Sequence, residues 1–496
     1  MKLLKYLLET AVFICGAVVM IFELVGSRVL GPYFGTSIFV WSTLIGVILG
    51  SLSLGYFIGG KVADKKPRMI ILASIIFIAA VFIALTLFIK SFVLNFLQIR
   101  ITDIRISSVI ASLVLFLPTS VLLGMVSPYA AKLKLHDLNV SGRIIGNLYA
   151  ISTAGSIFGT FLAGFYLIPH FGTNKLLSIL SFTLIIISAM LFIKNTGKTK
   201  LFVFLCFALC LTGINAFGYF YRKAGFIDVD TGYNRVWIYD YTDAGTNKPV
   251  RIMRINNINS SSMFLNSDEL ANEYTKYYHL VKHFNPGFKN TLMLGGAGYS
   301  YPKDFLLKYP EATIDVVEID PMVTGLAKKY FKLKDNSRLT IFHEDGRVFL
   351  NTTKKKYDAI FGDAFTSHHS VPYQLTTQEA VQKKFDILND NGVVILNIIA
   401  SLKGGKSRFL KAESATYKSI FPQVFLFPVS DPGNETILQN VILVALKSNN
   451  PQSFTDADPQ LNGFLQHVLK KGLDTDMPVL TDDFAPVDYY TSSLIF

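Results

Sequence analysis

Seven stretches of about 20 apolar residues fill the first 220 positions of this 496-residue chain. They lie near residues 8–29, 36–60, 69–90, 107–128, 145–168, 175–193 and 201–220. A helix of about 20 residues crosses the ~30 Å hydrocarbon core of a bilayer. The sequence therefore predicts an α-helical transmembrane bundle over residues 1–220, in a multi-pass protein of the cell membrane.

Positive charges alternate between the loops that join these stretches. Twelve lie on one side: Lys2, Lys5, Lys61, Lys65, Lys66, Arg68, Lys132, Lys134, Arg143, Lys194, Lys198 and Lys200. Five lie on the other side: Arg28, Lys90, Arg100, Arg105 and Lys175. Because cytoplasmic loops are enriched in Lys and Arg, we expect a cytoplasmic N-terminus. Seven spans then carry everything after Phe220 to the outer side.

Several other features of the sequence concern packing and partners. The net charge is +12, but no basic stretch is interleaved with aromatic residues, so nucleic acid is not an expected partner. Cys15, Cys206 and Cys210 all lie in apolar stretches, and no metal site is predicted. Small residues four apart let membrane helices approach closely, and this spacing occurs in Gly46/Gly50, Gly55/Gly59 and Gly155/Gly159.

After Tyr221 the composition becomes more polar and the pattern changes. The stretches TGYNRVWIYDY and KPVRIMRINNINSSSMFL have the alternation and β-branched character of strands. They predict a small β-domain over residues 221–266. Residues 267–496 follow as a third domain.

The stretch TLMLGGAGYSYPKDFLLKYPEATIDVVEIDP (291–321) predicts a buried strand, a glycine turn, a helix and a second strand. Glycines at such a turn let the backbone approach a ligand, which identifies Gly295, Gly296 and Gly298 as candidates. Glu318 and Asp320 follow the second strand, where a carboxylate can accept both hydroxyls of a ribose.

Three more strands are predicted, and two of them end at an aspartate. LTIFHEDG ends at Asp345 and Gly346, YDAIFGDAF ends at Asp363, and GVVILNII supplies a fifth strand. The order predicts a doubly wound, Rossmann-like α/β domain of the class I methyltransferase type, which binds ligands at the carboxyl ends of its strands. The turn lacks the third glycine of the dinucleotide fingerprint, so an adenosine-sulfonium ligand fits better than a nicotinamide cofactor.

From about Thr231 onward the chain resembles the spermidine synthase (polyamine aminopropyltransferase) family, and the whole chain resembles its multi-span bacterial branch. The matching stretches are GYNRVWIYD, the Tyr278–His279 pair, LGGAG, VVEIDP, HEDGRVFL, YDAIFGDAF, VPYQLTTQEA and LTDDFAPVDYY. The resemblance implies that Glu318 holds the ribose, Asp345 the adenine amino group, and that Asp363 is the general base. The implied donor is decarboxylated S-adenosylmethionine or S-adenosylmethionine, with no separate cofactor.

The resemblance also implies an acceptor site for an amine. Its expected residues are Tyr278, His279, Tyr373, Asp482 and Asp483, with His368 and His369 as weaker candidates. The chain departs from the family here: the turn GGAGYS lacks the aspartate of the family's GGGDG, Thr366 replaces a second aspartate, and Ser261 or a neighbour replaces a glutamine. Because these missing groups would bind the cationic ends of a diamine, we expect putrescine to be a poor acceptor.

The sequence is compatible with three functions. The first is a membrane-anchored aminopropyltransferase, which releases methylthioadenosine. The second is an S-adenosylmethionine-dependent methyltransferase, which releases S-adenosylhomocysteine. The third is a transporter or sensor with a non-catalytic nucleoside- or polyamine-binding domain, since residues 59–68 resemble a loop of major facilitator transporters.

The expected partners are a small amine and the lipid bilayer, and a homodimer is left open. The count of Lys and Arg places the transferase domain on the outer side of the membrane. The implied donor, however, is a cytoplasmic metabolite. A further membrane segment would reverse the predicted orientation, and residues 90–106 are the candidate for it.

Overall fold

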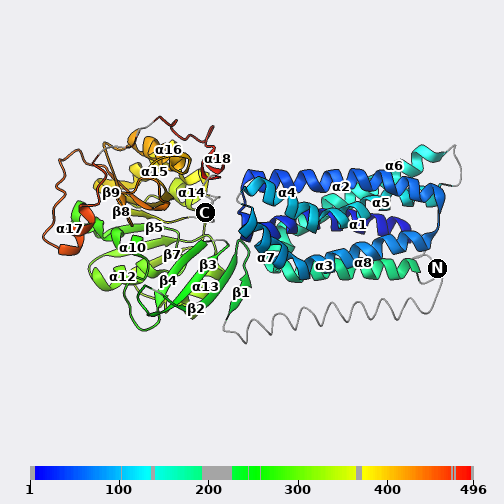
Figure 1. The fold of residues 1–496 in the computed structure, drawn as a ribbon, viewed down its shortest axis with the longest axis horizontal. Coiled ribbons are helices and arrows are strands. Elements are labelled where there is room, and N and C mark those ends of the chain that lie inside the picture. The colour runs from blue at the N-terminus through cyan, green and yellow to red at the C-terminus, as the bar shows by residue number, and fades with distance from the viewer. Residues whose placement is uncertain are drawn as a thin grey trace. The chain divides into compact units, whose positions relative to one another are not determined.

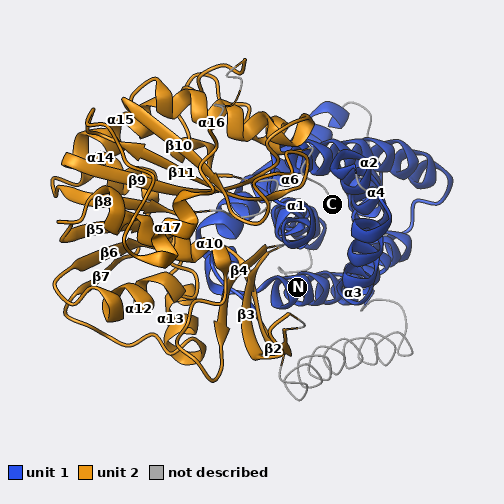
Figure 2. Cartoon of the chain, turned by 60° about the vertical axis from the view of Figure 1, so that its left-hand side comes forward, with its two compact units in different colours: residues 1–225, 229–232 blue, residues 226–228, 233–496 orange. Residues whose placement is uncertain are grey.

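The computed structural model describes residues 6–492 except 102, 136–139, 193–225, 244, 257, 365–370, 471–472 and 474–475. The chain divides into two compact units, coloured separately in Figure 2. The first comprises residues 1–225 and 229–232, and the second comprises residues 226–228 and 233–496.

The first unit is helical (Figure 1). Its described elements are α1 (Leu7–Phe34), α2 (Ile38–Lys65), α3 (Met69–Arg100), α4 (Ile104–Leu115), α5 (Leu117–Lys134), α6 (Ser141–Leu162), the π-helical η3 (Ala163–Leu167), α7 (Ile168–His170) and α8 (Thr173–Phe192). Five helices in the described part are long and apolar enough to cross a membrane, or six if the bent pair α4–α5 is one span. These helices are compatible with a membrane protein. The predicted span at 201–220 lies outside the described residues.

Two details of the helical unit differ from the sequence prediction. Residues 90–106 do not form a separate segment, because α3 continues to Arg100 and the Asp103 side chain then caps α4. The stretch 107–128 is not one straight helix, since α4 and α5 meet at an angle of 53°. Pro118 at the start of α5 lacks the N–H that a continuous helix needs, which accounts for the break.

The predicted glycine contacts are present in two of the three pairs. A Cβ on Gly55 would lie 2.2 Å from a carbonyl oxygen of α5, and one on Gly155 would lie 2.0 Å from a carbonyl oxygen of α1. Gly59 and Gly159 are packed as closely. The prediction is wrong for Gly46 and Gly50, which have no neighbouring atom within 4 Å. The spacing of small residues therefore does not by itself determine which helix faces are packed.

The second unit contains two sheets. The smaller has the order β1-β2-β3-β4, with β1 at Ile227–Asp230, β2 at Arg235–Thr242, β3 at Pro249–Ile255 and β4 at Ile258–Phe264. Adjacent strands from β2 to β4 are antiparallel. The helical segments α10 (Glu273–Lys276), η4 (Tyr277–Leu280) and α11 (Val281–Phe284) connect this sheet to the larger one.

The larger sheet has seven strands in the order β10-β11-β9-β8-β5-β6-β7. Their bounds are β5 (Asn290–Leu294), β6 (Thr313–Val317), β7 (Leu339–Phe342), β8 (Tyr357–Gly362), β9 (Leu388–Ala400), β10 (Gln423–Pro428) and β11 (Gln439–Leu446). The five strands from β9 to β7 are parallel, as expected for a Rossmann-like domain, whereas β11 pairs antiparallel with both β9 and β10. The sheet is therefore mixed, and the sequence prediction missed its antiparallel edge.

Helices cover both faces of the larger sheet (Figure 1). On one face lie α12 (Ser300–Lys308), α13 (Pro321–Tyr330) and α17 (Pro459–Leu465); on the other lie α14 (Gly346–Thr352), α15 (Gln378–Ile387), α16 (Arg408–Lys418) and α18 (Val487–Thr491). Neighbouring residues of one strand enter opposite cores: Met293 joins the first, and Leu292 and Leu294 join the second. Burial on both faces explains why this strand reads as a continuous apolar run.

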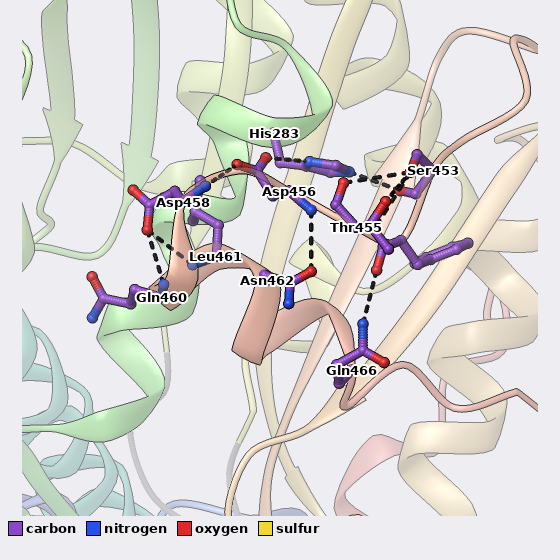
Figure 3. A network of polar contacts seen from close by, with 10 residues as sticks. His283, Ser453, Thr455, Asp456, Asp458, Gln460, Leu461, Asn462 and Gln466 are labelled. Carbon is purple, nitrogen blue, oxygen red and sulfur yellow. Dashed lines mark hydrogen bonds and ion pairs between the residues drawn. The ribbon is translucent and has the colours of Figure 1, made fainter.

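A network of hydrogen bonds connects the start of α17 and the residues before it to α11, which follows the small sheet (Figure 3). His283 Nδ1 lies 2.7 Å from Asp456 Oδ2, and its Nε2 lies 2.8 Å from the carbonyl oxygen of Ser453. Both nitrogens thus face oxygen atoms of the segment that precedes α17. Asp458 caps α17 through the amides of residues 460 and 461. The network stabilises the position of the helical segment 273–284, which contributes to the site described next.

Candidate active site

The second unit contains a cavity of about 740 Å³ at the carboxyl ends of the parallel strands. Strand order arranges its polar residues in a row. The row runs from Asn440 on β11 through Asn397 on β9 and Asp363 after β8 to Gly295 after β5, Glu318 after β6 and Asp345 after β7. This edge of an open α/β sheet is where ligands bind. Asp363 separates the strands with predicted nucleotide contacts from β9 and β11.

The glycine turn brings backbone very close to the neighbouring strand end. Gly295 has φ +93°, and a Cβ there would lie 2.6 Å from the carbonyl oxygen of Asp363. Ala297 and Tyr299 also have positive φ, at 43° and 54°. Non-glycine residues rarely adopt this conformation, and such backbone strain is concentrated at ligand sites. Gly295 and Gly296 line the cavity, whereas Gly298 faces Ser261 of β4.

Glu318 lines the cavity and organises the glycine turn. Its Oε2 accepts hydrogen bonds from the amides of Gly296 and Ala297 at 3.0 and 3.1 Å, and its Oε1 accepts one from Asp320 N at 3.0 Å. Desolvation raises the pKa of Glu318, while these three hydrogen bonds oppose the shift. The predicted partner acid, Asp320, does not line the cavity; it is buried and caps α13 through the Met322 amide.

Asp345 caps a helix with one carboxylate oxygen and also lines the cavity. Its Oδ1 accepts hydrogen bonds from the amides of Arg347 and Val348 at 2.8 and 3.1 Å, so the residue caps α14. Asp345 and Gly346 also line the cavity, beside Glu318. A carboxylate can accept further hydrogen bonds on its second oxygen. Asp345 can therefore cap the helix and contact a ligand at the same time.

This arrangement predicts different results for two substitutions of Asp345. Asp345→Ser keeps a capping oxygen, whereas Asp345→Ala also removes the cap at a cost of about 1 kcal/mol in stability. If the second oxygen binds an adenine amino group, both variants should lose the discrimination between adenosine and inosine nucleosides. Thermal unfolding and calorimetric titration would measure the two effects. Retained discrimination in Asp345→Ser would make Asp345 a helix cap only.

Asp363 is partly buried at the centre of the row. Its Oδ2 accepts a hydrogen bond from the Tyr274 hydroxyl at 2.8 Å, and its Oδ1 accepts one from Asn397 Nδ2 at 3.1 Å. Desolvation raises the pKa of Asp363 to about 6, although Asn397, Tyr274 and Tyr278 lower it by stabilising the carboxylate. The two hydrogen bonds fix the orientation of the carboxylate. A pKa near the working pH is suited to a general base.

The residues predicted for the acceptor are not brought together. Tyr278 is buried beneath the cavity, with its hydroxyl 3.2 Å from the carbonyl oxygen of Gly362. His279 faces the core instead, 2.8 Å from both Asp304 Oδ2 and the Tyr309 hydroxyl.

The other three predicted acceptor residues lie outside the cavity lining. Asp482 accepts hydrogen bonds from Arg347 Nη2 and Thr377 Oγ1, both at 2.6 Å, so it links α14, α15 and the C-terminal segment. Tyr373 and Asp483 are exposed. His368 and His369 lie outside the described residues.

Sequence reasoning missed three residues that surround Asp363. Tyr274 and Asn397 contact its carboxylate directly, and Asn440 Nδ2 donates to Asn397 Oδ1 at 2.9 Å. The available signal was an asparagine inside each of two apolar strands, GVVILNII and QNVILVAL. A polar side chain in a strand that is buried on both faces needs a polar partner or a ligand.

The structure explains why the glycine turn has no aspartate. Letter by letter, the family's GGGDG places its aspartate at Gly298. A Cβ on Gly298 would lie 2.7 Å from Ser261 Cβ, and the Ser261 hydroxyl accepts a hydrogen bond from Gly298 N at 2.9 Å. Ser261 thus occupies the space that a side chain at position 298 would need.

The fold and this row of groups define a Rossmann-like domain with a polar cavity at the carboxyl ends of its parallel strands, where a partly buried carboxylate of raised pKa lies. In agreement, residues 273–453 match the spermine/spermidine synthase domain. A polyamine aminopropyltransferase of Vibrio vulnificus (strain CMCP6) is 30% identical over 221 residues, which cover 41% of this chain and 71% of that protein. The chain belongs to the spermine/spermidine synthase family, and it is a transferase.

A second relative extends the similarity. Polyamine aminopropyltransferase 2 of Aquifex aeolicus (strain VF5) is 24% identical over 381 residues, covering 73% of this chain and 72% of that protein. Because 73% of the chain exceeds the second unit, this alignment reaches into the helical half. A probable spermidine synthase from Corynebacterium glutamicum ATCC 13032 superposes with a TM-score of 0.42 at 19% identity, covering 50% of this chain and 94% of that one.

Proposed function

We propose that the chain is a membrane-anchored aminopropyltransferase, which transfers an aminopropyl group from decarboxylated S-adenosylmethionine to an amine. The observation that carries the proposal is the position of Asp363, a carboxylate of raised pKa between the glycine turn and the amide-bearing strands β9 and β11. Relatives named polyamine aminopropyltransferase favour aminopropyl transfer over methyl transfer.

The proposed donor occupies the cavity over β5, β6 and β7. Glu318 would accept the ribose hydroxyls, Asp345 would accept the adenine amino group, and Gly295 and Gly296 would leave room for the nucleoside. The aminopropyl carbon next to sulfur would then lie near Asp363. Holding donor and acceptor in one trajectory lowers the entropic part of the barrier.

The chemical step requires an unprotonated amine. Asp363 accepts a proton from the amine, whose nitrogen lone pair forms a bond to the aminopropyl carbon. The carbon–sulfur bond breaks, and its electron pair stays on sulfur. Methylthioadenosine leaves as a neutral thioether, so the leaving group needs no acid. General-base catalysis by a positioned carboxylate contributes about 10²–10⁴ in rate.

The helical unit supports membrane anchoring, and we propose a multi-pass protein of the cell membrane. The distribution of Lys and Arg in the sequence favours an outer location of the transferase unit. A reporter fused after Phe496, active either only in the cytoplasm or only outside it, would determine the side.

The reaction is tested by the identity of the nucleoside product. Purified protein is incubated with decarboxylated S-adenosylmethionine or S-adenosylmethionine and a panel of amines. Methylthioadenosine from the first donor is the expected product. S-adenosylhomocysteine from the second would indicate methyl transfer, and release of neither nucleoside would contradict the proposal.

Donor binding is tested at Glu318. We expect Glu318→Gln to weaken methylthioadenosine binding by about 1.5–3 kcal/mol, since a hydrogen bond to a charged group is lost. Calorimetry would measure the affinity. Because Glu318 also holds the glycine turn, Asp320→Asn is a useful comparison: it changes a buried acid of the same loop outside the cavity. Equal affinities of wild type and a folded Glu318→Gln would refute the ribose assignment.

The base is tested by the pH dependence of kcat/KM. Asn397 Nδ2 stabilises the ionised form of Asp363 and lowers its pKa. Asn397→Ala should therefore raise the pKa of Asp363 above about 6 and move the acidic limb of the profile to higher pH. An unchanged limb would show that Asp363 does not control the profile.

A further inference from the structure

The orientation of two asparagine side chains follows from the charge of Asp363. An ionised carboxylate only accepts hydrogen bonds, so Asn397 must direct its Nδ2 toward Asp363. Asn397 Oδ1 then faces Asn440 and accepts from its Nδ2. This leaves Asn440 Oδ1 as a hydrogen-bond acceptor on the cavity wall. No hydrogen bond between described residues ends on that oxygen.

The cavity on this side of Asp363 has a neutral polar wall. Strands β9 and β11 and the turn after β10 contribute Asn397, Ile399, Val429, Ser430 and Asn440 to the described lining, and none of these is an acid. A desolvated ammonium requires a paired charge, which this wall does not supply.

Three carboxylates of the lining have no role in the proposed reaction: Asp243, Glu273 and Glu344. Glu344 follows β7 next to Asp345, on the donor side of Asp363 and away from this wall. Glu273 forms an ion pair with Lys276 at 2.6 Å and is largely exposed. Asp243 accepts hydrogen bonds from the amide and hydroxyl of Thr246 at 2.9 and 2.7 Å, in the turn between β2 and β3. Exposed and already paired carboxylates contribute little to binding a second cation.

We propose that the acceptor is an amine with an uncharged, hydrogen-bonding far end, such as an amino alcohol, and that Asn440 and Ser430 select it. This inference rests on the proposed aminopropyl transfer. Asp363 receives the proton of the reacting amine, and the tail extends along β9 and β11. A hydroxyl at its end donates to Asn440 Oδ1, whereas a second ammonium is left without a countercharge.

Three amines with the same four-carbon chain test the proposal: 4-amino-1-butanol, butylamine and putrescine. They differ only in the group at the far end, which is a hydroxyl, a hydrogen or a second amine. With wild type and decarboxylated S-adenosylmethionine, kcat/KM for methylthioadenosine release should be at least tenfold higher for 4-amino-1-butanol than for putrescine. A preference for putrescine would overturn the inference and leave the proposed reaction intact. Failure of all amines to release methylthioadenosine would refute the reaction, and the inference with it.

Asn440→Ala separates a specificity role from support of the base. The variant should abolish the preference for 4-amino-1-butanol over butylamine, so that the ratio of their kcat/KM values falls to about one, whatever the common loss through Asn397 and Asp363. An equal loss for all three amines would mean that Asn440 acts only through Asn397 and Asp363, and would overturn its assignment to specificity.

A gain of function provides the converse test. Ser430→Asp adds a carboxylate to the neutral wall and should raise the ratio of kcat/KM for putrescine to that for butylamine at least tenfold. Ser448→Asp is the matched control, since Ser448 lies outside the described cavity lining. Glu273→Gln, made as a single substitution, tests the remaining acid of the lining. If it raised the KM for putrescine tenfold, Glu273 would be the residue that binds the second ammonium, and the proposal would be wrong.

Discussion

Asp363→Asn should lower turnover by about 10²–10⁴ while donor affinity stays within a factor of about two, because the lost group is an acid-base catalyst. An amide cannot take a proton from the attacking amine at neutral pH. The reaction would then depend on the small fraction of amine that is already unprotonated. Single-turnover release of methylthioadenosine, with calorimetry for donor binding, would separate the two quantities.

The pH profile adds a second criterion for Asp363. With its pKa raised to about 6, the carboxylate is ionised above that pH and protonated below it. Activity of the wild type should therefore level off above pH 6 and fall about tenfold per unit below it, whereas Asp363→Asn should show no break near pH 6 and should keep rising toward the pKa of the free amine. Asp335→Asn, which alters an exposed ion pair with Lys328, is the control and should behave as wild type. Equal rates for wild type and Asp363→Asn would remove Asp363 from the mechanism.

The sequence could predict that the proposed donor-binding residues share one cavity, because their signals are local in sequence. Gly295 and Gly296 directly follow β5, Glu318 directly follows β6, and Asp345 lies three residues after the end of β7. In a parallel sheet the ends of such strands meet at one edge. Sequence order and strand ends were therefore enough to collect these residues in one cavity.

The opposite side could not be predicted in the same way. Asn397 and Asn440 are neighbours only because β11 pairs antiparallel with β9, and an apolar run carries no information on strand direction. Asp482 was expected near the acceptor, but its partner Arg347 is 135 residues away in sequence. Ion pairs of such separation depend on the assembled fold and leave no local pattern.

The aromatic and histidine residues show a different limit. The pattern around Tyr278 and His279 identified a segment that does approach the site, but the 3-10 conformation of η4 decides which side chains face the cavity. Tyr274, four residues before Tyr278, donates to Asp363, whereas His279 faces Asp304 in the core. In a 3-10 helix each residue is rotated about 120° around the axis from the one before it, so the neighbour of a residue near the site can face the core.

Gly295→Ala should reduce methylthioadenosine affinity by about 100-fold or more, the equivalent of ~2.7 kcal/mol. The backbone at φ +93° disfavours any Cβ. In addition, the new methyl group would lie 2.6 Å from the carbonyl oxygen of Asp363, which is backbone and cannot rotate away. The turn and the strand end that holds the base must therefore separate, which disturbs donor binding and catalysis together.

Gly325→Ala makes the same chemical change where the structure allows it. Gly325 lies within α13 and has no neighbouring atom within 4 Å of the added Cβ. Alanine in a helix should leave affinity unchanged and raise stability by about 0.5–1 kcal/mol. Calorimetric titration and thermal unfolding of both variants would separate loss of the site from loss of the fold. Wild-type affinity in Gly295→Ala would show that the turn does not need to approach Asp363 so closely, and that the nucleoside does not depend on this contact.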